Sequence, residues 1–525
     1  MFVNDVGKIG LIADKPPHSL PLNAWSDGQN VRMFESGVEK MTGHRSAIGT
    51  PSVAPYFMLP VRGSSNEAFW IYAGGTAIYV TQGGQSGTHK NITRSSGAYS
   101  ASTSSQDWSG FIFGGVPILN NSSDVPQMWN PVNFTTPQLL QDLTNWPTGL
   151  RCKSLSSFKQ FMIAMDITKP VSGVSTHFPR VIKWSHASEA NSVPSSWDET
   201  SATLDAGEYE LADSQGEILS GKQLRDSFLI YKSDSIWGMN FIGTPYIFRF
   251  YEVSTQYGAI SRHSVLEVEG GHIVFANGDL LLCDGHAVKS LMTQRMRRFL
   301  FNSIDAENYK NSFLALNQPK NEVWICYPVS GASWPNRVVI WNYKENTFGV
   351  RDLPEGTTYG TNGVVNPSDD LDWSSSSGWD SVEDNWDAKV FNPSQTRLMI
   401  SNATSTKLYL VDTTNQFDSV NATSYIERTG LHFDKPDIVK LATQVNLNFE
   451  KTGTGEIEVL VGSHDSPEGS VSWSSPEVID PTTEAGSKVD GLVSGKYLAL
   501  RIQSNANVGW KLHSYKWSLT EMGTN

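Results

Sequence analysis

The chain has 525 residues, of which 39% are hydrophobic, 11% aromatic and 18% charged, and its formal net charge is −13. So many apolar residues exclude wholesale disorder, and the acidic balance argues against a sequence-reading nucleic-acid binder, which needs a basic face. Three widely spaced cysteines form neither a disulfide framework nor a zinc motif, and neither a signal peptide nor a transmembrane run is visible. We expect a soluble, β-rich protein assembled in a reducing cytosol, with no membrane insertion.

Residues 1–50 are rich in Pro, Gly and Asn and short of apolar runs, which predicts an extended N-terminal arm. From about residue 65 one unit recurs, in which two apolar runs flank a small polar turn. Gly74-Gly75 and Asn277-Gly278 are turn dipeptides that two-residue hairpins favour, because both residues need positive φ. The clearest units are 69–80, 227–239, 272–283 and 397–412.

Further hairpins near Phe111, Phe161 and Trp324 bring the spacing of these units to roughly 40 to 75 residues. Because a four-stranded propeller blade takes about 40 to 50 residues, the spacing predicts a β-propeller-like domain over 51–419. The pattern R-V-x-x-W occurs at both 180–184 and 337–341, which indicates an internal repeat.

A helix is predicted over 287–301, where an apolar stripe runs beside basic residues that include Arg297 and Arg298. We interpret this basic stripe as a solvated face or a partner for carboxylates rather than a DNA contact.

A polar insertion at about 366–395 carries Trp373, Trp379 and Trp386. Exposed tryptophan is unfavourable, so we expect this loop to dock on a neighbouring subunit. Beyond residue 420 the apolar residues alternate regularly, as at 445–449, 457–461 and 497–502. This pattern predicts a C-terminal antiparallel β-sandwich over 420–525.

No specific catalytic motif is present: GxSxG, P-loop, HExxH and EF-hand patterns are all missing from the sequence. We therefore predict no enzyme activity, cofactor or metal. Acidic, Trp-rich propellers do include glycoside hydrolases, so a carbohydrate-binding or glycan-cleaving propeller acting on host surface polysaccharide stays open as the alternative. The stretch Ser463–Trp473 approaches the Asp-containing turn of sialidase-like propellers, but it is two residues longer, occurs once and falls in the sandwich. We interpret it as a capped hairpin loop.

The N-terminal stretch from Pro16 to Gly43, with its phrase Leu20-Pro-Leu-Asn-Ala-Trp-Ser-Asp-Gly-Gln-Asn-Val-Arg32, resembles the opening of structural proteins from tailed bacteriophages. The segments 321–328 and 336–348 are similar to a blade segment of the same virion proteins. Within this class the chain resembles most the tail nozzle (tail tubular or tail-stabilisation) proteins of short-tailed phages.

The resemblance implies a β-propeller subunit of a six-fold ring in the virion tail, assembled in the host cytoplasm. Its implied partners are other copies of itself, the head-to-tail adaptor and tail fibre or tip proteins, with viral DNA passing through transiently. An adaptor-bound hub or a fibre-attachment protein remains possible within the class.

In such a ring the arm either packs on an adjacent subunit or closes the propeller as an outer strand. For the first role Trp25 is the anchor candidate, and Arg32 and Lys40 are candidates to pair with acidic neighbours.

Overall fold

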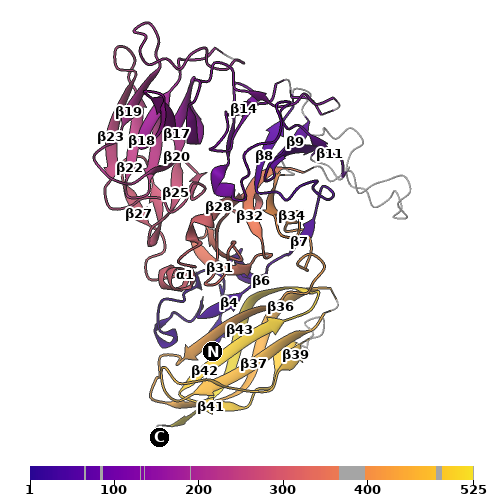
Figure 1. Cartoon of the computed structure of the whole chain (residues 1–525). Helices are drawn as coiled ribbons and strands as arrows, with labels where there is room; N and C mark the ends of the chain where they lie inside the picture. The colour runs from indigo at the N-terminus through magenta and orange to yellow at the C-terminus, as the bar shows by residue number, and fades with distance from the viewer. Residues whose placement is uncertain are drawn as a thin grey trace.

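The computed structural model describes residues 1–523 except 64–66, 83–86, 131, 135, 190, 366–395, 454 and 480–486. A β-propeller, purple to orange in Figure 1, stands on the yellow C-terminal β-sandwich, and the N-terminal arm runs between them. The predicted all-β fold class, with an arm, a propeller and a sandwich, is confirmed. Trp373, Trp379 and Trp386 lie outside the described residues.

The described residues form seven propeller blades of four antiparallel strands each. Their second strands are near-continuous apolar runs, because neighbouring blades bury both faces. The first four blades are β8 (Phe57–Arg62), β9 (Ala68–Ala73), β10 (Ile78–Gln82) and β11 (His89–Asn91); β12 (Ser109–Phe113), β13 (Val116–Asn120), β14 (Gln127–Met128) and β15 (Gln141–Asp142); β16 (Arg151–Phe158), β17 (Phe161–Val171), β18 (Val174–Trp184) and β19 (Gly207–Glu210); and β20 (Ile218–Leu224), β21 (Ser227–Lys232), β22 (Ile236–Phe241) and β23 (Phe248–Ser254).

The last three blades close the ring. β8 of the first blade packs on β32 of the seventh, and β7 pairs with β34 as the seventh blade's outer strand. This is the second of the two roles left open for the arm. These blades are β24 (Val265–Val268), β25 (Gly271–Ala276), β26 (Asp279–Cys283) and β27 (Val288–Ser290); β28 (Phe313–Asn317), β29 (Glu322–Tyr327), β30 (Arg337–Asn342) and β31 (Thr347–Asp352); and β32 (Thr357–Val364), β33 (Thr396–Asn402), β34 (Lys407–Val411) and β7 (His44–Ser46).

The predicted hairpins are confirmed as pairs of neighbouring strands within blades. The four clearest units are each the second and third strands of a blade. Both copies of R-V-x-x-W also occupy third strands, β18 and β30, so the repeated pattern occupies equivalent blade positions.

The predicted helix over 287–301 is wrong in its first half. Val288–Ser290 form β27 and pair with β26, and α1 begins only at Arg297 (Arg297–Ser303). The need to complete the blade's outer edge outweighs the local helical pattern. The predicted apolar stripe is nevertheless real, since Met292, Met296 and Leu300 are fully buried.

The sandwich packs two antiparallel sheets, and burial alternates along its strands as predicted. One sheet has the order β38-β37-β42-β35-β4, and the other contains β6-β43-β36-β40. The strands are β35 (Ser424–Leu431), β36 (Val439–Thr452), β37 (Ile457–His464), β38 (Ser472–Trp473), β39 (Glu477–Ile479), β40 (Lys488–Val489), β41 (Val493–Gly495), β42 (Tyr497–Ser504) and β43 (Gly509–Gly523).

The arm joins the propeller to the sandwich. Its hairpin of β5 (Val31–Phe34) and β6 (Gly37–Lys40) lies between β31 and β43, so the sixth blade and one sandwich sheet form a single eleven-stranded sheet. One apolar core therefore runs from the sixth blade into the sandwich. The other short strands of the arm are β1 (Phe2–Val3), which pairs with β43, β2 (Gly10–Leu11), which pairs with β3 (Ala24–Trp25), and β4 (Asp27–Gln29), which pairs with β35.

Candidate functional site

The segment of residues 20–40, called the joint here, contains the phage-like phrase and contacts both domains. Asn30 is fully buried with a left-handed φ of 55°. Its Nδ2 donates to the Thr423 carbonyl in the sandwich at 2.8 Å, and its Oδ1 accepts from the backbone N–H of Asp352 in the sixth blade at 2.9 Å. Asp27 accepts from the Tyr425 hydroxyl at 3.0 Å. The phrase thus builds the connection between propeller and sandwich.

Arg32 of the joint forms a buried ion cluster with two carboxylates. Its Nε lies 2.9 Å from Glu322 Oε1, and its Nη2 lies 2.9 Å from Asp412 Oδ1. Asn317 donates to both carboxylates, at 3.0 Å to Glu322 and 2.8 Å to Asp412. The cluster therefore links the arm to the sixth blade and to the end of the seventh.

The electrostatics of this cluster follow from burial and from the paired charges. Burial alone raises the pKa of Asp412, but the guanidinium groups of Arg32 and Arg351 bring it down to about 2. Burial raises the pKa of Glu322 despite the neighbouring Arg32. Next to the cluster, burial and the charge of Arg351 lower the pKa of His44 to about 3.

The other two arm candidates are also engaged within the chain. Trp25 is 1% exposed, and its Nε1 donates to the Val6 carbonyl at 2.7 Å. The Nζ of Lys40 donates to the Ala506 carbonyl at 2.8 Å, and burial lowers its pKa to about 8. The acidic partners expected for Arg32 are therefore Glu322 and Asp412 of its own chain rather than a neighbour's carboxylates, because the arm is part of the monomer's core.

The inner strands of the propeller bring aromatic rings together at its axis. Phe57 of β8 and Tyr359 of β32 have ring centroids 4.8 Å apart, and Phe313 of β28 lies 5.9 Å from Tyr359. His263, just before β24, stands 4.8 Å from Tyr359 and 5.7 Å from Phe57. These side chains come from four blades or their connections, so aromatic rings from different blades meet across the axis.

A 3-10 turn (Ser105–Asp107) lies next to these aromatic rings and crosses one end of the propeller. It lies between the first two blades but contacts the connection between the fourth and fifth. Gln106 accepts from the backbone N–H of Arg262 at 2.9 Å, and Ser105 O lies 2.8 Å from His263 Nε2. The Arg262 guanidinium donates to Ser122 Oγ at 3.0 Å. Sequence reasoning missed these residues because no motif marks them.

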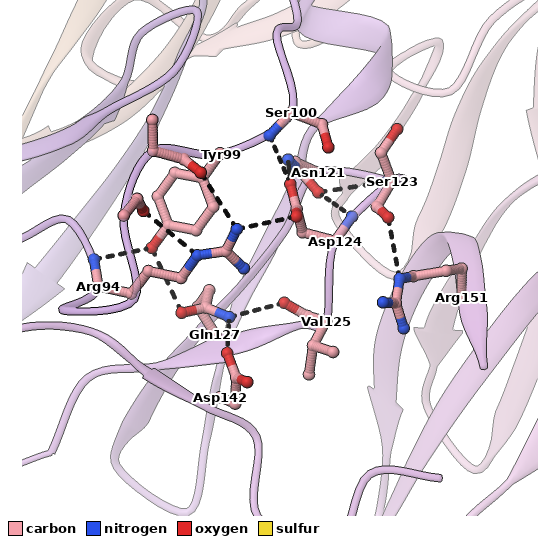
Figure 2. A network of polar contacts seen from close by, with 12 residues as sticks. Arg94, Tyr99, Ser100, Asn121, Ser123, Asp124, Val125, Gln127, Asp142 and Arg151 are labelled. Atoms are coloured by element: carbon pink, nitrogen blue, oxygen red, sulfur yellow. Dashed lines mark hydrogen bonds and ion pairs between the residues drawn. The ribbon is translucent and has the colours of Figure 1, made fainter. Parts of the chain in front are cut away.

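Figure 2 shows a polar network beside the segment between β11 and β12, which contains the 3-10 turn. Asp124 accepts from Arg94 Nη2 at 2.9 Å, from the Ser100 backbone N–H at 2.7 Å and from Asn121 Nδ2 at 2.8 Å. Although burial opposes the change, these donors lower the pKa of Asp124. Both carboxylate oxygens of Asp124 therefore accept hydrogen bonds, and through Arg94 and Ser100 they hold the chain that leads into the 3-10 turn.

Other kinds of site have few candidates in the part of the chain that the structure describes. No three of its His, Cys, Asp and Glu side chains gather where they could hold a metal ion. Cys152, Cys283 and Cys326 are buried free thiols. None of the described helices has the length and hydropathy to span a membrane.

Neither a protein-family model nor a curated protein matches the chain. Solved structures that resemble it include the AfRom2 CNH domain, at 10% identity and a TM-score of 0.34, covering 59% of this chain and 88% of that one. Puromycin hydrolase resembles the chain at 10% identity and a TM-score of 0.37, covering 73% of this chain and 59% of that one. PorZ of the type-IX secretion system of Porphyromonas gingivalis resembles it at 10% identity and a TM-score of 0.34, covering 75% of this chain and 44% of that one. The chain thus spans about 59% and 44% of the latter two, and likenesses this distant carry no argument about function.

Proposed function

We propose that this chain is a structural protein of a bacteriophage virion tail. In this proposal six copies form the nozzle ring that extends the DNA-exit channel below the portal and adaptor and anchors fibres or a tip. A hub or fibre-attachment station in the same tail is the nearest variant of the proposal.

The observation that carries the proposal is what the phage-like phrase does in the fold. Trp25, Asn30 and Arg32 are all buried, and they tie the arm, the propeller and the sandwich together. Because these residues hold the three parts of the chain together, the likeness of the phrase concerns the architecture of the whole chain rather than a loop. This supports assigning to the chain the structural role that the resemblance to phage tail proteins implies.

The aromatic contacts at the propeller axis are consistent with a ring in which the DNA channel lies between subunits. Because Phe57, His263 and Tyr359 meet at the axis of the propeller, DNA passes between copies in this proposal and not through one of them. A formal charge of −13 suits the wall of such a channel, since each basic group on it would add attraction to phosphates.

The residues at the propeller axis do not support the glycan-cleaving alternative. It requires a deep axial pocket with two carboxylates on either side of a sugar bond. In the part of the chain that the structure describes, the rings of Phe57, His263 and Tyr359 and the guanidinium of Arg262 lie in that region. We therefore retain the structural role as the proposed function.

Electron microscopy of tails isolated from purified particles tests the proposal. We expect a six-fold ring of this chain around one common channel, with each propeller closed at its own axis. A tail whose density lacks the chain contradicts the proposal, as does DNA density along the axis of a propeller.

A further inference from the structure

The strand by which the arm completes the seventh blade is short. β7 has only the residues His44–Ser46, and it pairs with β34 along this length. On the other side of β7, the His44 N–H donates to the Gln416 carbonyl at 3.2 Å, and the Asp418 N–H donates to the His44 carbonyl at 2.8 Å. Because few backbone hydrogen bonds hold β7, the contacts of the His44 side chain help to decide whether the strand stays in place.

The His44 side chain is buried against a cation. Its Nδ1 lies 3.1 Å from Arg351 Nη2, and a guanidinium only donates, so Nδ1 is the acceptor and the imidazole is neutral. His44 is 2% exposed and Arg351 is fully buried. In the described part of the chain Arg351 has no ion pair with a carboxylate, and the rings of Trp324 and Phe417 lie 4.8 and 4.7 Å from its guanidinium carbon.

A proton on His44 is incompatible with this contact. The charged imidazole donates at both nitrogens, so Nδ1 could no longer accept from Arg351, and two cations would face each other in the interior. Burial and a neighbouring like charge both disfavour the charged ring. Accordingly, burial and the charge of Arg351 lower the pKa of His44 to about 3.

The other charged groups that face His44 do not offset a proton. Asp418, which follows β34, favours the charged ring, and Lys407 of β34 opposes it. Asp418 is already paired, since Lys407 Nζ lies 2.6 Å from its Oδ2 and the Tyr409 hydroxyl donates to the same oxygen at 3.1 Å. The Tyr409 ring packs against His44 with centroids 4.8 Å apart. Among the described residues, the surroundings of His44 therefore offer no carboxylate free to pair with a charged imidazole.

We propose that β7 is an acid-sensitive closing strand: uptake of a proton by His44 requires residues 43–47 to leave the seventh blade, so acid detaches the arm there. The released histidine takes up its proton at its ordinary pKa of about 6.5. The strand is therefore fully held above pH 6.5, and the hold weakens as pH falls. This device goes beyond the proposed tail role and does not depend on it.

Hydrogen exchange measured by mass spectrometry on the full chain between pH 7 and 5 tests the proposal. Each rate is divided by that of an unstructured peptide of the same sequence at the same pH, so that it reports the opening equilibrium. We expect the opening of residues 43–47 to rise about 25-fold from pH 7 to 5, which corresponds to the uptake of one proton. β7 should also be less protected than β29 at every pH. A change below five-fold, or equal protection of the two strands, overturns the proposal.

Variants identify the group that takes up the proton. His44→Asn places an amide oxygen where Nδ1 accepts from Arg351 and does not titrate, so the 25-fold change should disappear. His272→Gln, on β25 of the fifth blade, is the matched control and should retain the change. A folded His44→Asn protein that keeps the pH dependence contradicts the assignment.

If thermal unfolding shows that His44→Asn does not fold, the pH profile of the unchanged chain decides. An opening equilibrium for residues 43–47 that is flat above pH 6.5 and rises about tenfold per pH unit below it supports the proposal. Any other profile contradicts it.

Discussion

Arg32 and Asp412 lie 380 positions apart in the chain, yet the Nη2 of one is 2.9 Å from a carboxylate oxygen of the other. This contact brings the arm back to the end of the seventh blade. It adds a buried ion pair to the backbone pairing of β7 with β34, which closes the ring of blades. The arm that distinguishes this sequence is therefore a part of the propeller's closure.

Replacing Arg32 by Met leaves Glu322 and Asp412 buried without their cation. We expect the free energy of unfolding to fall by about 3–5 kcal/mol, because breaking one partner of a buried ion pair strands the other charge. Chemical denaturation measures the change. Lys435→Met is the control, since Lys435 and its partner Glu521 are both about half exposed. Equal losses in the two variants would contradict the assigned role of the cluster.

Asn30 offers a way to separate backbone strain from hydrogen bonding. Asn30→Ala loses the side-chain bonds to Thr423 and Asp352 and also places alanine at a φ of 55°, so we expect a loss of about 2–4 kcal/mol. Asn30→Gly loses the same bonds without the strain and should be about 1 kcal/mol more stable than the alanine variant. The measurement is denaturation followed by fluorescence. If Asn30→Ala proves more stable than Asn30→Gly, the left-handed backbone conformation does not account for the loss of stability in the alanine variant.

Stability should fall in mild acid because two buried histidines stay neutral in the fold. Burial lowers the pKa of His44 to about 3 and of His272 to about 4. The unfolded chain takes up these protons near pH 6.5 and the folded chain does not. The stabilisation is therefore complete above pH 6.5 and is lost as pH falls toward 4, with a limiting slope of about 1.4 kcal/mol per pH unit per histidine.

His272→Gln tests this pH dependence directly. Glutamine can keep the contacts to Tyr231 and to the Gln223 carbonyl, but it does not titrate. In denaturation series between pH 7.5 and 4, the unfolding free energy of this variant should change less steeply with pH than that of the unchanged protein. The difference in slope should correspond to about one proton fewer taken up on unfolding. The exposed His286→Gln serves as the control. A His272→Gln profile parallel to the unchanged chain would refute the assignment.

The crossing segment at the axis should loosen when Arg262 is replaced by Met. The variant loses the guanidinium's bonds to the Gln106 backbone carbonyl and to Ser122, and it keeps the bond from the Arg262 backbone N–H to the Gln106 side chain. We expect amide hydrogen exchange in residues 104–107 to reflect a loss of about 1–3 kcal/mol of protection, with the blade strands unaffected. Unchanged exchange in this segment would show that Arg262 does not hold it.

Local patterns predicted the blades well. Hairpins such as 69–80 and 272–283 were visible because their turns carry glycine and their apolar runs are long. No local signal marks the turn between β5 and β6, since Glu35 and Ser36 adopt φ of 50° and 60° without being glycine. β27 was mistaken for helix because an outer strand of three residues is specified by its partner strand and not by its own pattern.

The interior sites were less predictable, because their partners are far apart in the sequence. Arg32 was expected to form an ion pair, but nothing local indicates Glu322 or Asp412 as its partners. The meeting of Phe57, His263 and Tyr359 likewise depends on the order of the blades around the axis. Only the three-dimensional ring brings such residues together.

The copy number of this chain relative to the portal protein in purified virions, measured by quantitative mass spectrometry, tests the tail assignment most directly. A six-fold nozzle ring below a twelve-fold portal predicts a ratio of about one half. A ratio near one would instead indicate an adaptor-like ring, and absence of the chain from virions would contradict the structural role.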